Sequence, residues 1–280
     1  ILGLGLKNHR QGSNRLDASD RDLAANIRKW PVHGMYMPDS IAAFASAGGT
    51  YVVSANEGDG REYFYTYEED GEEVEELCFT DETRVKDVTL APGFRQPGNI
   101  TGGLQDDENL GRLIVSKFFP SVFTMEGYSK LASFGGRSMS IWDAAGNLVW
   151  DSGDLVAQEV LKRIGEDNWV YGPIIGTTYT DGEEGIDARS DAKGSEPEAI
   201  TTGVVNGRTL AFLGLERAGG IMMFDITNPR SPVFLQWQQT QDVSPEGLAF
   251  VPAEVSPTGE ALLIAATEIS GTTVIFRIEQ

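Results

Sequence analysis

One phrase occurs three times along this chain and constrains its fold more than any other feature. Each copy has a proline followed by an acid, then two short apolar runs, and then a glutamate with a glycine soon after it. The copies extend from Pro38 to Glu57, from Pro197 to Glu216 and from Pro245 to Glu268. The first two are equally long, and the third is longer by an insertion in the turn-rich stretch PAEVSPTGE. Equal spacing with an insertion at a turn is typical of duplicated structural units.

The second copy contains the most complete unit. Its apolar runs AITTGVV, TLAFLGLE, GIMMFDI and VFLQWQQ are short and are separated by turn residues such as NGR and TNPRSP. This pattern predicts four antiparallel strands, and four-stranded sheets repeated radially form a β-propeller. We therefore predict an all-β chain with about four propeller blades, either as a single domain or as the C-terminal portion of one. The candidate blades are residues 37–116, 128–153, 196–239 and 244–280.

The segments between the repeats complete this picture. Residues 130–153 contain a meander with an AAGN hairpin turn. The stretch LGRLIVS at 110–116 is expected to be the outer strand of the first blade, reached through the acidic insertion 68–109. Because that insertion is rich in Glu, Asp, Gly and Pro, it is expected to be a solvated loop. Residues 155–166 have a helical apolar period and predict one short surface helix.

Composition excludes several classes of function. The chain has 22 basic and 42 acidic residues and a net charge of −20, which argues against a nucleic-acid partner and is compatible with bound cations. Cys78 is the single cysteine, so no intramolecular disulfide can form. No apolar run approaches the ~20 residues that a membrane-spanning helix needs, and no membrane span is predicted.

Seven motifs, spread in order over nearly the whole chain, give it a specific resemblance. With these motifs the chain resembles the choice-of-anchor I family. The resemblance implies a propeller of roughly seven blades, of which these residues are the C-terminal part, and a secreted or surface-attached bacterial protein. It also implies a possible enzymatic activity, since some members are described as atypical alkaline phosphatases. The motifs are Trp30–Ala42, Ala55–Tyr63, Leu110–Val115, Phe134–Asp143, Arg189–Glu198, Gly214–Pro229 and Ser244–Thr272.

The repeated acids are the first candidate site. In a propeller, the start of each innermost strand and the end of the next strand lie near the central channel, so these acids are expected to converge. Converging carboxylates must be protonated, paired with arginine or bound to a cation, and calcium prefers such oxygen ligands. Two hypotheses stay open: a calcium site at the channel mouth, or structural ion pairs that hold the blades together. The candidates are Asp39, Glu57, Glu198, Glu216, Glu246 and Glu268.

Two local acidic runs are further candidates. The stretch LDASDRD places Asp17, Asp20 and Asp22 close in sequence. It is interpreted either as an irregular calcium loop, lacking the glycine and distal glutamate of an EF-hand, or as a helix-capping turn. The second run, with Asp181, Glu183, Asp187 and Asp191, is interpreted either as a solvated loop or as a lid over the channel face.

Signatures of catalysis are scarce, because the sequence has no G-x-S-x-G elbow and no zinc-protease histidine pair. We predict a secreted or surface binding and scaffold module without catalytic activity, stabilised by calcium. Its expected partners are extracellular matrix, another surface component or further copies of itself. The alternative is a phosphoesterase whose carboxylates hold a metal and whose arginines clamp the phosphate of a phosphoester substrate. The candidate catalytic residues are then Arg61, Arg137, Arg189 and Arg217.

Overall fold

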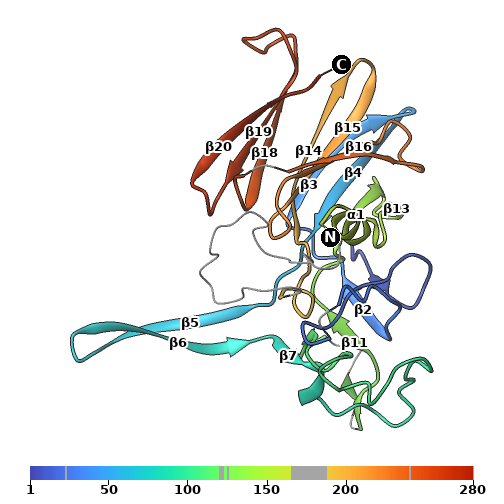
Figure 1. The fold of residues 1–280 in the computed structure, drawn as a ribbon, viewed down its shortest axis with the longest axis vertical. Helices are drawn as coiled ribbons and strands as arrows, with labels where there is room; N and C mark the ends of the chain where they lie inside the picture. Colours follow the sequence, from blue (N-terminus) through green and yellow to red (C-terminus); the bar gives the residue numbers. More distant parts are fainter. Residues whose placement is uncertain (23, 120–122, 125, 165–187, 240, 280) are drawn as a thin grey trace.

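The computed structural model describes residues 1–280 apart from 23, 120–122, 125, 165–187, 240 and 280. The described part of the chain is built from β-sheets and has one α-helix, which confirms the predicted all-β class. Within these described residues, four sheets of three to five strands are stacked side by side, and no sheet closes on itself (Figure 1). Among the described residues, no helix is both long and apolar enough to cross a membrane.

The second repeat copy forms a four-stranded antiparallel sheet in sequence order, as predicted. Runs of Val, Leu, Ile and Phe form these strands, and the left-handed Asn206 and Gly207 make the first hairpin turn. The strands are β14 (Pro197–Val205), β15 (Arg208–Leu215), β16 (Ile221–Asp225) and β17 (Val233–Gln238).

The third repeat copy forms a neighbouring antiparallel sheet of three strands. Its first strand lies against β14, so the innermost strands of two repeat copies are neighbours. Phe212 of β15 stacks on Phe250 of this sheet with ring centroids 5.9 Å apart, and together they fill the core between the two sheets. The strands are β18 (Pro245–Val251), β19 (Leu262–Thr267) and β20 (Thr272–Arg277).

The first repeat copy supplies only half of its sheet. Its two strands share a sheet with two strands that follow a long insertion, because β12 returns antiparallel beside β4. Candidate blades 37–116 and 128–153 therefore contribute to the same sheet, whose order is β13-β12-β4-β3. The strands are β3 (Ser40–Ser46), β4 (Gly49–Asn56), β12 (Ser138–Asp143) and β13 (Leu148–Asp151).

A fourth sheet collects short strands from distant parts of the chain. The stretch expected to be the outer strand of the first blade forms β8 here, so that assignment was wrong: β8 pairs with β7 and β11. The order is β1-β2-β11-β8-β7. The strands are β1 (Leu6–Asn8), β2 (Val32–Met35), β7 (Glu82–Arg84), β8 (Ile114–Ser116) and β11 (Leu131–Ser133). The segments between these strands contain the 3-10 helix η1 (Val85–Asp87) and the hairpin of β9 (Phe123–Thr124) and β10 (Gly127–Tyr128).

The acidic insertion is not entirely a solvated loop. Its first part forms a long hairpin, β5 (Glu62–Glu69) and β6 (Glu72–Thr80), which projects from the stacked sheets (Figure 1). The middle of β5 is an unbroken run of Tyr, Phe and Thr from Tyr63 to Tyr67, and such β-favouring residues outweigh the loop signal of the glutamates around the turn. In the part of the chain that the structure describes, the two strands pair only with each other.

The predicted helix is confirmed as α1 (Leu155–Ile164). Val156 and Val160 on one face are buried against the sheets formed by the first and second repeat copies. Val53 and Leu213, also buried, belong to the same core from the two sheets. This packing fixes the two sheets relative to each other, and the acids at their strand ends with them.

Candidate functional site

The three repeat copies share a backbone feature where their acids lie. The residue before each repeat proline has a positive φ: 42° at Met37, 53° at Glu196 and 63° at Ser244. A non-glycine residue in the left-handed region is strained, and proline further disfavours it at the preceding position. The same strained turn in all three copies indicates that they are equivalent structural units. Such turns were not predicted from the sequence.

The repeated acids converge at one end of the sheets, as expected. Carboxylate oxygens of Glu57, Glu198 and Glu216 lie within 4.8 Å of one another, and those of Glu216, Glu246 and Glu268 form a second such group. Glu216 belongs to both groups. These five residues are called the carboxylate cluster. They come from all three repeat copies, so the cluster depends on the packing of three sheets.

Asp39 lies at the edge of the carboxylate cluster. Its charge contributes to raising the pKa of both Glu198 and Glu246, which places it near them, although neither group of converging oxygens includes it. Of the six repeated acids predicted to converge, the structure thus brings five into direct proximity and one alongside.

A buried carboxylate missed by the sequence predictions holds the cations of this region. Glu196 is fully buried, and its oxygens lie 2.7 Å from Arg189 Nη2, 3.4 Å from Arg217 Nε and 3.3 Å from Lys193 Nζ. Lys193 also forms an ion pair with Glu57. The spacing Glu-Pro-Glu was the available signal for Glu196, but the pattern did not distinguish the residue before the proline from a solvated acid.

The three cations do not neutralise the whole cluster. Burial, together with neighbouring carboxylates, raises the pKa of Glu57 to about 7 and that of Glu198 to about 7. The pKa of Glu216 is raised further, to about 10, by burial and by repulsion from Glu196 and Glu198. The buried Oε2 of Glu198 has no hydrogen-bond partner among the described residues. A donor set of crowded carboxylate oxygens with an unpartnered buried oxygen fits a hard divalent cation.

The four candidate arginines lie at three separate places. Arg189 and Arg217 lie at the carboxylate cluster, where Arg217 Nη2 is also 3.3 Å from Glu216. Arg137 donates to the carbonyl oxygens of Asp17 and Ala192 at 2.7 and 2.6 Å. Arg61 pairs with Asp81 at 3.1 Å at the base of the hairpin. The structure therefore does not gather all four arginines around one substrate position.

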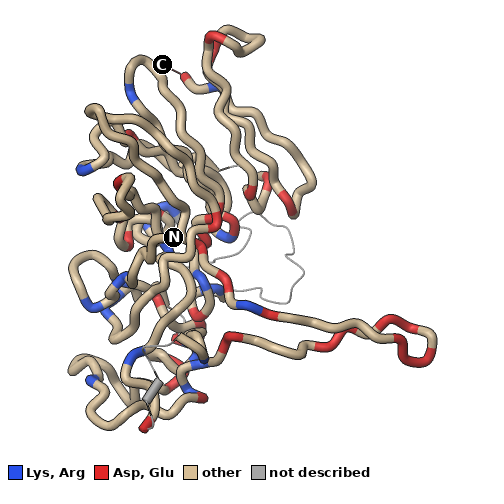
Figure 2. Tube along the Cα trace, turned by 180° about the vertical axis from the view of Figure 1, so that it is seen from behind, with Lys and Arg blue, Asp and Glu red and all other residues tan. Residues whose placement is uncertain are grey.

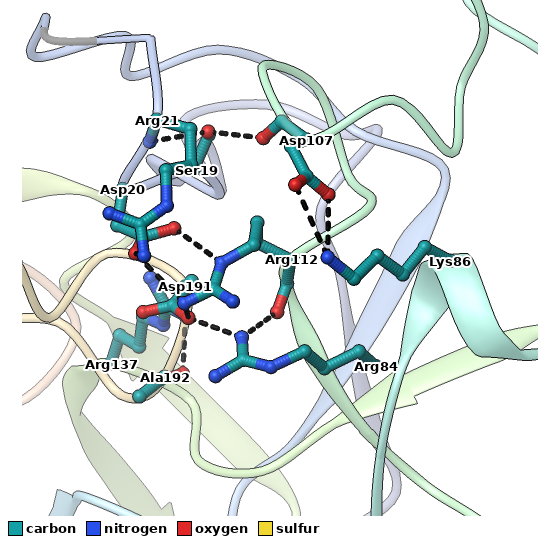
Figure 3. A network of polar contacts seen from close by, with 10 residues as sticks. All are labelled: Ser19, Asp20, Arg21, Arg84, Lys86, Asp107, Arg112, Arg137, Asp191 and Ala192. Carbon is teal, nitrogen blue, oxygen red and sulfur yellow. Dashed lines mark hydrogen bonds and ion pairs between the residues drawn. The ribbon is translucent and has the colours of Figure 1, made fainter.

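The aspartates of the predicted calcium loop point to different partners. Asp20 binds Arg112 through two hydrogen bonds of 2.9 and 3.0 Å (Figure 3). Asp17 accepts a hydrogen bond from the backbone N–H of Asn26, and Asp22 accepts one from the side-chain amide of Asn26. Burial and the charge of Asp22 raise the pKa of Asp17 to about 7. Because the three aspartates bind different partners, the structure weakens the interpretation of this stretch as a calcium loop.

Asp191, expected either in a solvated loop or in a lid, is instead buried in the same ion network. It pairs with Arg84 and lies 3.3 Å from Arg112 (Figure 3). The other lid candidates, Asp181, Glu183 and Asp187, lie outside the described residues. Asp191 thereby connects the segment before the second repeat copy to the fourth sheet.

Replacing Arg112 by methionine is expected to lower the free energy of unfolding by about 2–3 kcal/mol, because Asp20 loses two charge-assisted hydrogen bonds and Asp191 loses one. Arg21→Met is the control: Arg21 also contacts Asp20, at 3.3 Å, but its side chain is 56% exposed, and an exposed pair contributes about 0–1 kcal/mol. Urea denaturation measures both. Equal losses in the two variants would contradict the structural role of the network.

Comparisons with known proteins agree with the sequence resemblance. The family model described as "Choice-of-anchor I domain" matches residues 1–229. A "Mesenchyme-specific cell surface glycoprotein" of Strongylocentrotus purpuratus is 27% identical over 259 residues, covering 84% of this chain and 31% of that protein. "Gigasin-3a" of Magallana gigas is 26% identical over 204 residues, covering 62% of this chain and 66% of that protein. The chain thus spans less than two thirds of either relative.

Proposed function

Because this chain belongs to the choice-of-anchor I family, we propose that it is a secreted or cell-surface module that binds or scaffolds other components without catalysis. The observation that carries the proposal is the carboxylate cluster, in which acids of three repeat copies meet at the junction of their sheets. One relative is named a cell surface glycoprotein, which supports an extracellular location. The expected partners are extracellular matrix or another surface component.

The finer architecture belongs to the same proposal. We infer that the stacked sheets are blades of a β-propeller with roughly seven blades. Two observations support this. The innermost strand β14 lies beside both β3 and β18, and the same left-handed turn precedes all three repeat prolines. Both are expected where blades pack around an axis.

Calcium is the cation that fits the carboxylate cluster best, since it takes six to eight oxygen ligands in flexible geometry. Glu216, Glu246 and Glu268, which form one of the two groups of converging oxygens, would hold it, because Glu57 of the other group is already paired with Lys193. When bound, calcium supplies positive charge that offsets the repulsion among these carboxylates. The role of the cluster is then to join three sheets.

The proposal is tested by melting the protein in 2 mM CaCl₂ and in EDTA. If the dissociation constant is about 20 µM, calcium stabilises the folded chain by about 2.7 kcal/mol, a rise in Tm of roughly 5–10 °C for a chain of this size. Phosphomonoester and phosphodiester hydrolysis, assayed with calcium and with zinc at neutral and alkaline pH, is expected to be undetectable. An unchanged Tm would contradict the calcium role.

The runner-up function is a metal-dependent phosphoesterase, and one observation favours it: Arg217 contacts Glu216 of the carboxylate cluster, so an arginine adjoins the candidate metal ligands. Against it, Arg189 and Arg217 are both paired with Glu196. Turnover that disappears in Arg217→Met, while the Tm stays within a few degrees of the wild type, would favour the enzyme.

In EDTA, the stability of the protein is expected to fall as the pH rises from about 5 to about 8. The carboxyls of Glu57 and Glu198 have pKa values raised to about 7, so the folded state binds more protons than the unfolded state between pH 4.5 and 7. Stability falls with pH wherever this is so. Thermal melts at several pH values measure the slope, and Glu198→Gln is expected to flatten it. A slope of opposite sign would contradict the raised pKa values.

A further inference from the structure

The hairpin of β5 and β6, called the arm, lacks a partner of its own. It projects from the stacked sheets, and neither of its strands pairs with a third strand among the residues that the structure describes (Figure 1). Every residue of β5 is exposed. An isolated two-stranded hairpin is marginally stable in water, and exposed aromatic residues on such a hairpin are typical of an interaction surface.

The chemistry of the arm defines what it can bind. Seven acids lie between Glu68 and Glu76, and no lysine or arginine occurs from Glu62 to Thr83. Beside these acids, Tyr65 and Tyr67 are 46% and 38% exposed, with their rings stacked at 5.7 Å. The complementary surface therefore carries positive charge, preferably guanidinium groups that pack on aromatic rings.

The chain carries such a surface at a different place. A pocket of about 560 Å³ is lined by Arg10, Arg15, Arg28, Lys29 and Arg95 around Trp30, and none of its lining residues is acidic. On a chain with 42 acids and 22 basic residues, this gathering runs against the overall charge. We call it the basic pocket.

Two of the five cations of the basic pocket, Arg10 and Arg28, are held in place by neutral carbonyl groups. Arg10 Nη2 donates to the Arg95 carbonyl at 2.6 Å, and Arg28 Nη2 donates to the Asn99 carbonyl at 2.8 Å. Arg28 also lies 4.8 Å from the centroid of the Trp30 ring. Arg15 pairs with Asp154. Fixed guanidinium groups bound to neutral carbonyls remain available to carboxylates.

The arm and the basic pocket lie on opposite sides of the molecule, so contact between them occurs between copies. In Figure 1 the arm extends to one side and the dark-blue segment after β1, which supplies most of the pocket, lies on the other; Figure 2 shows the same separation from behind. We propose that the acidic, tyrosine-bearing arm of one copy docks in the basic pocket of a second copy. Such a contact joins two different surfaces and therefore builds head-to-tail assemblies, which are open chains unless the rotation between copies closes a ring.

The net charge of −20 does not prevent this contact at physiological salt. The Debye length at 0.15 M ionic strength is ~8 Å, so repulsion between the distant parts of two copies is screened, whereas carboxylate–guanidinium pairs in direct contact persist. At 1 M salt, where the length is ~3 Å, the chains are expected to dissociate.

The test is a mixing experiment by sedimentation velocity, in 0.15 M NaCl with EDTA so that calcium cannot bridge acids. The pocket variant is R10Q/R28Q and the arm variant is E69Q/E72Q/E73Q. All of these residues are exposed except Arg28, which is half-buried, and circular dichroism checks the fold of both variants. Wild type is expected to form species that grow with concentration. Each variant alone is expected to stay monomeric, with self-association weakened at least tenfold. A 1:1 mixture is expected to give a heterodimer and nothing larger, because only one intact contact can form.

The matched control R230Q/R277Q removes the same charge from arginines outside the pocket and is expected to associate like the wild type. The proposal is overturned if wild type is monomeric at all concentrations, if the variants associate as strongly as wild type, or if the mixture associates no more than its parts. It is also overturned if the pocket binds inorganic phosphate or a sulfated polysaccharide while the protein stays monomeric, since the occupant then comes from another source. The proposed calcium role is unaffected by any of these outcomes.

Discussion

Replacing Glu196 by glutamine is expected to lower the free energy of unfolding by about 3–4 kcal/mol. Glu196 is fully buried and contacts Arg189, Lys193 and Arg217, whose side chains are only 12–16% exposed. Removing one partner from a buried ion network leaves charges unpaired and typically costs about 3–5 kcal/mol. Relief of repulsion on the neighbouring carboxylates offsets part of this cost.

Urea denaturation at pH 7.5 measures the loss, and Glu254→Gln serves as the control, because Glu254 is exposed. A loss below about 1 kcal/mol in the Glu196 variant would mean that Lys193 and the two arginines find other partners. The carboxylate cluster would then not depend on this buried acid, contrary to the structure.

Lys7→Met is expected to cost about 4 kcal/mol, because it breaks a buried ion pair that fastens β1 to the sheet of the first repeat copy. Lys7 Nζ lies 2.9 Å from Asp151 Oδ1 and donates to the carbonyls of Gly136 and Gly153, both at 2.9 Å. The Lys7 side chain is 1% exposed and that of Asp151 is 9% exposed. The variant leaves a buried carboxylate without its counter-charge.

A double-mutant cycle isolates this pair. Lys7→Met combined with Asp151→Asn is expected to cost less than the two single changes added together, with a coupling of at least ~2 kcal/mol, as for residues in direct contact. Additive losses would show that Lys7 acts through its carbonyl partners and not through Asp151.

The sequence was a good guide wherever a local pattern determines local structure. The strands of the second repeat copy and the helix at 155–164 follow from apolar periodicity, and their boundaries in the structure are close to those predicted. The convergence of Glu57, Glu198 and Glu216 was also predictable, because repeated units in equivalent positions bring equivalent residues to one end of the fold.

The sequence could not indicate which distant strands become neighbours. β4 and β12 pair although the hairpin arm and the short strands of the fourth sheet come between them, and short strands such as β8 fit several sheets equally well by pattern. Nor could it identify Lys7 as buried, since an isolated lysine near the N-terminus is usually exposed. Its partners Gly136 and Asp151 become neighbours only in the folded chain.

The most direct test of the central claim is calorimetric titration of calcium into the wild type and into Glu216→Gln at pH 7.5. Glu216 belongs to both groups of converging oxygens, so the variant is expected to lose the binding heat seen in the wild type. In EDTA the variant should melt at the same or a higher temperature, because glutamine resembles the protonated acid favoured by the raised pKa of Glu216. Identical calcium isotherms for the two proteins would contradict a cation site at the carboxylate cluster.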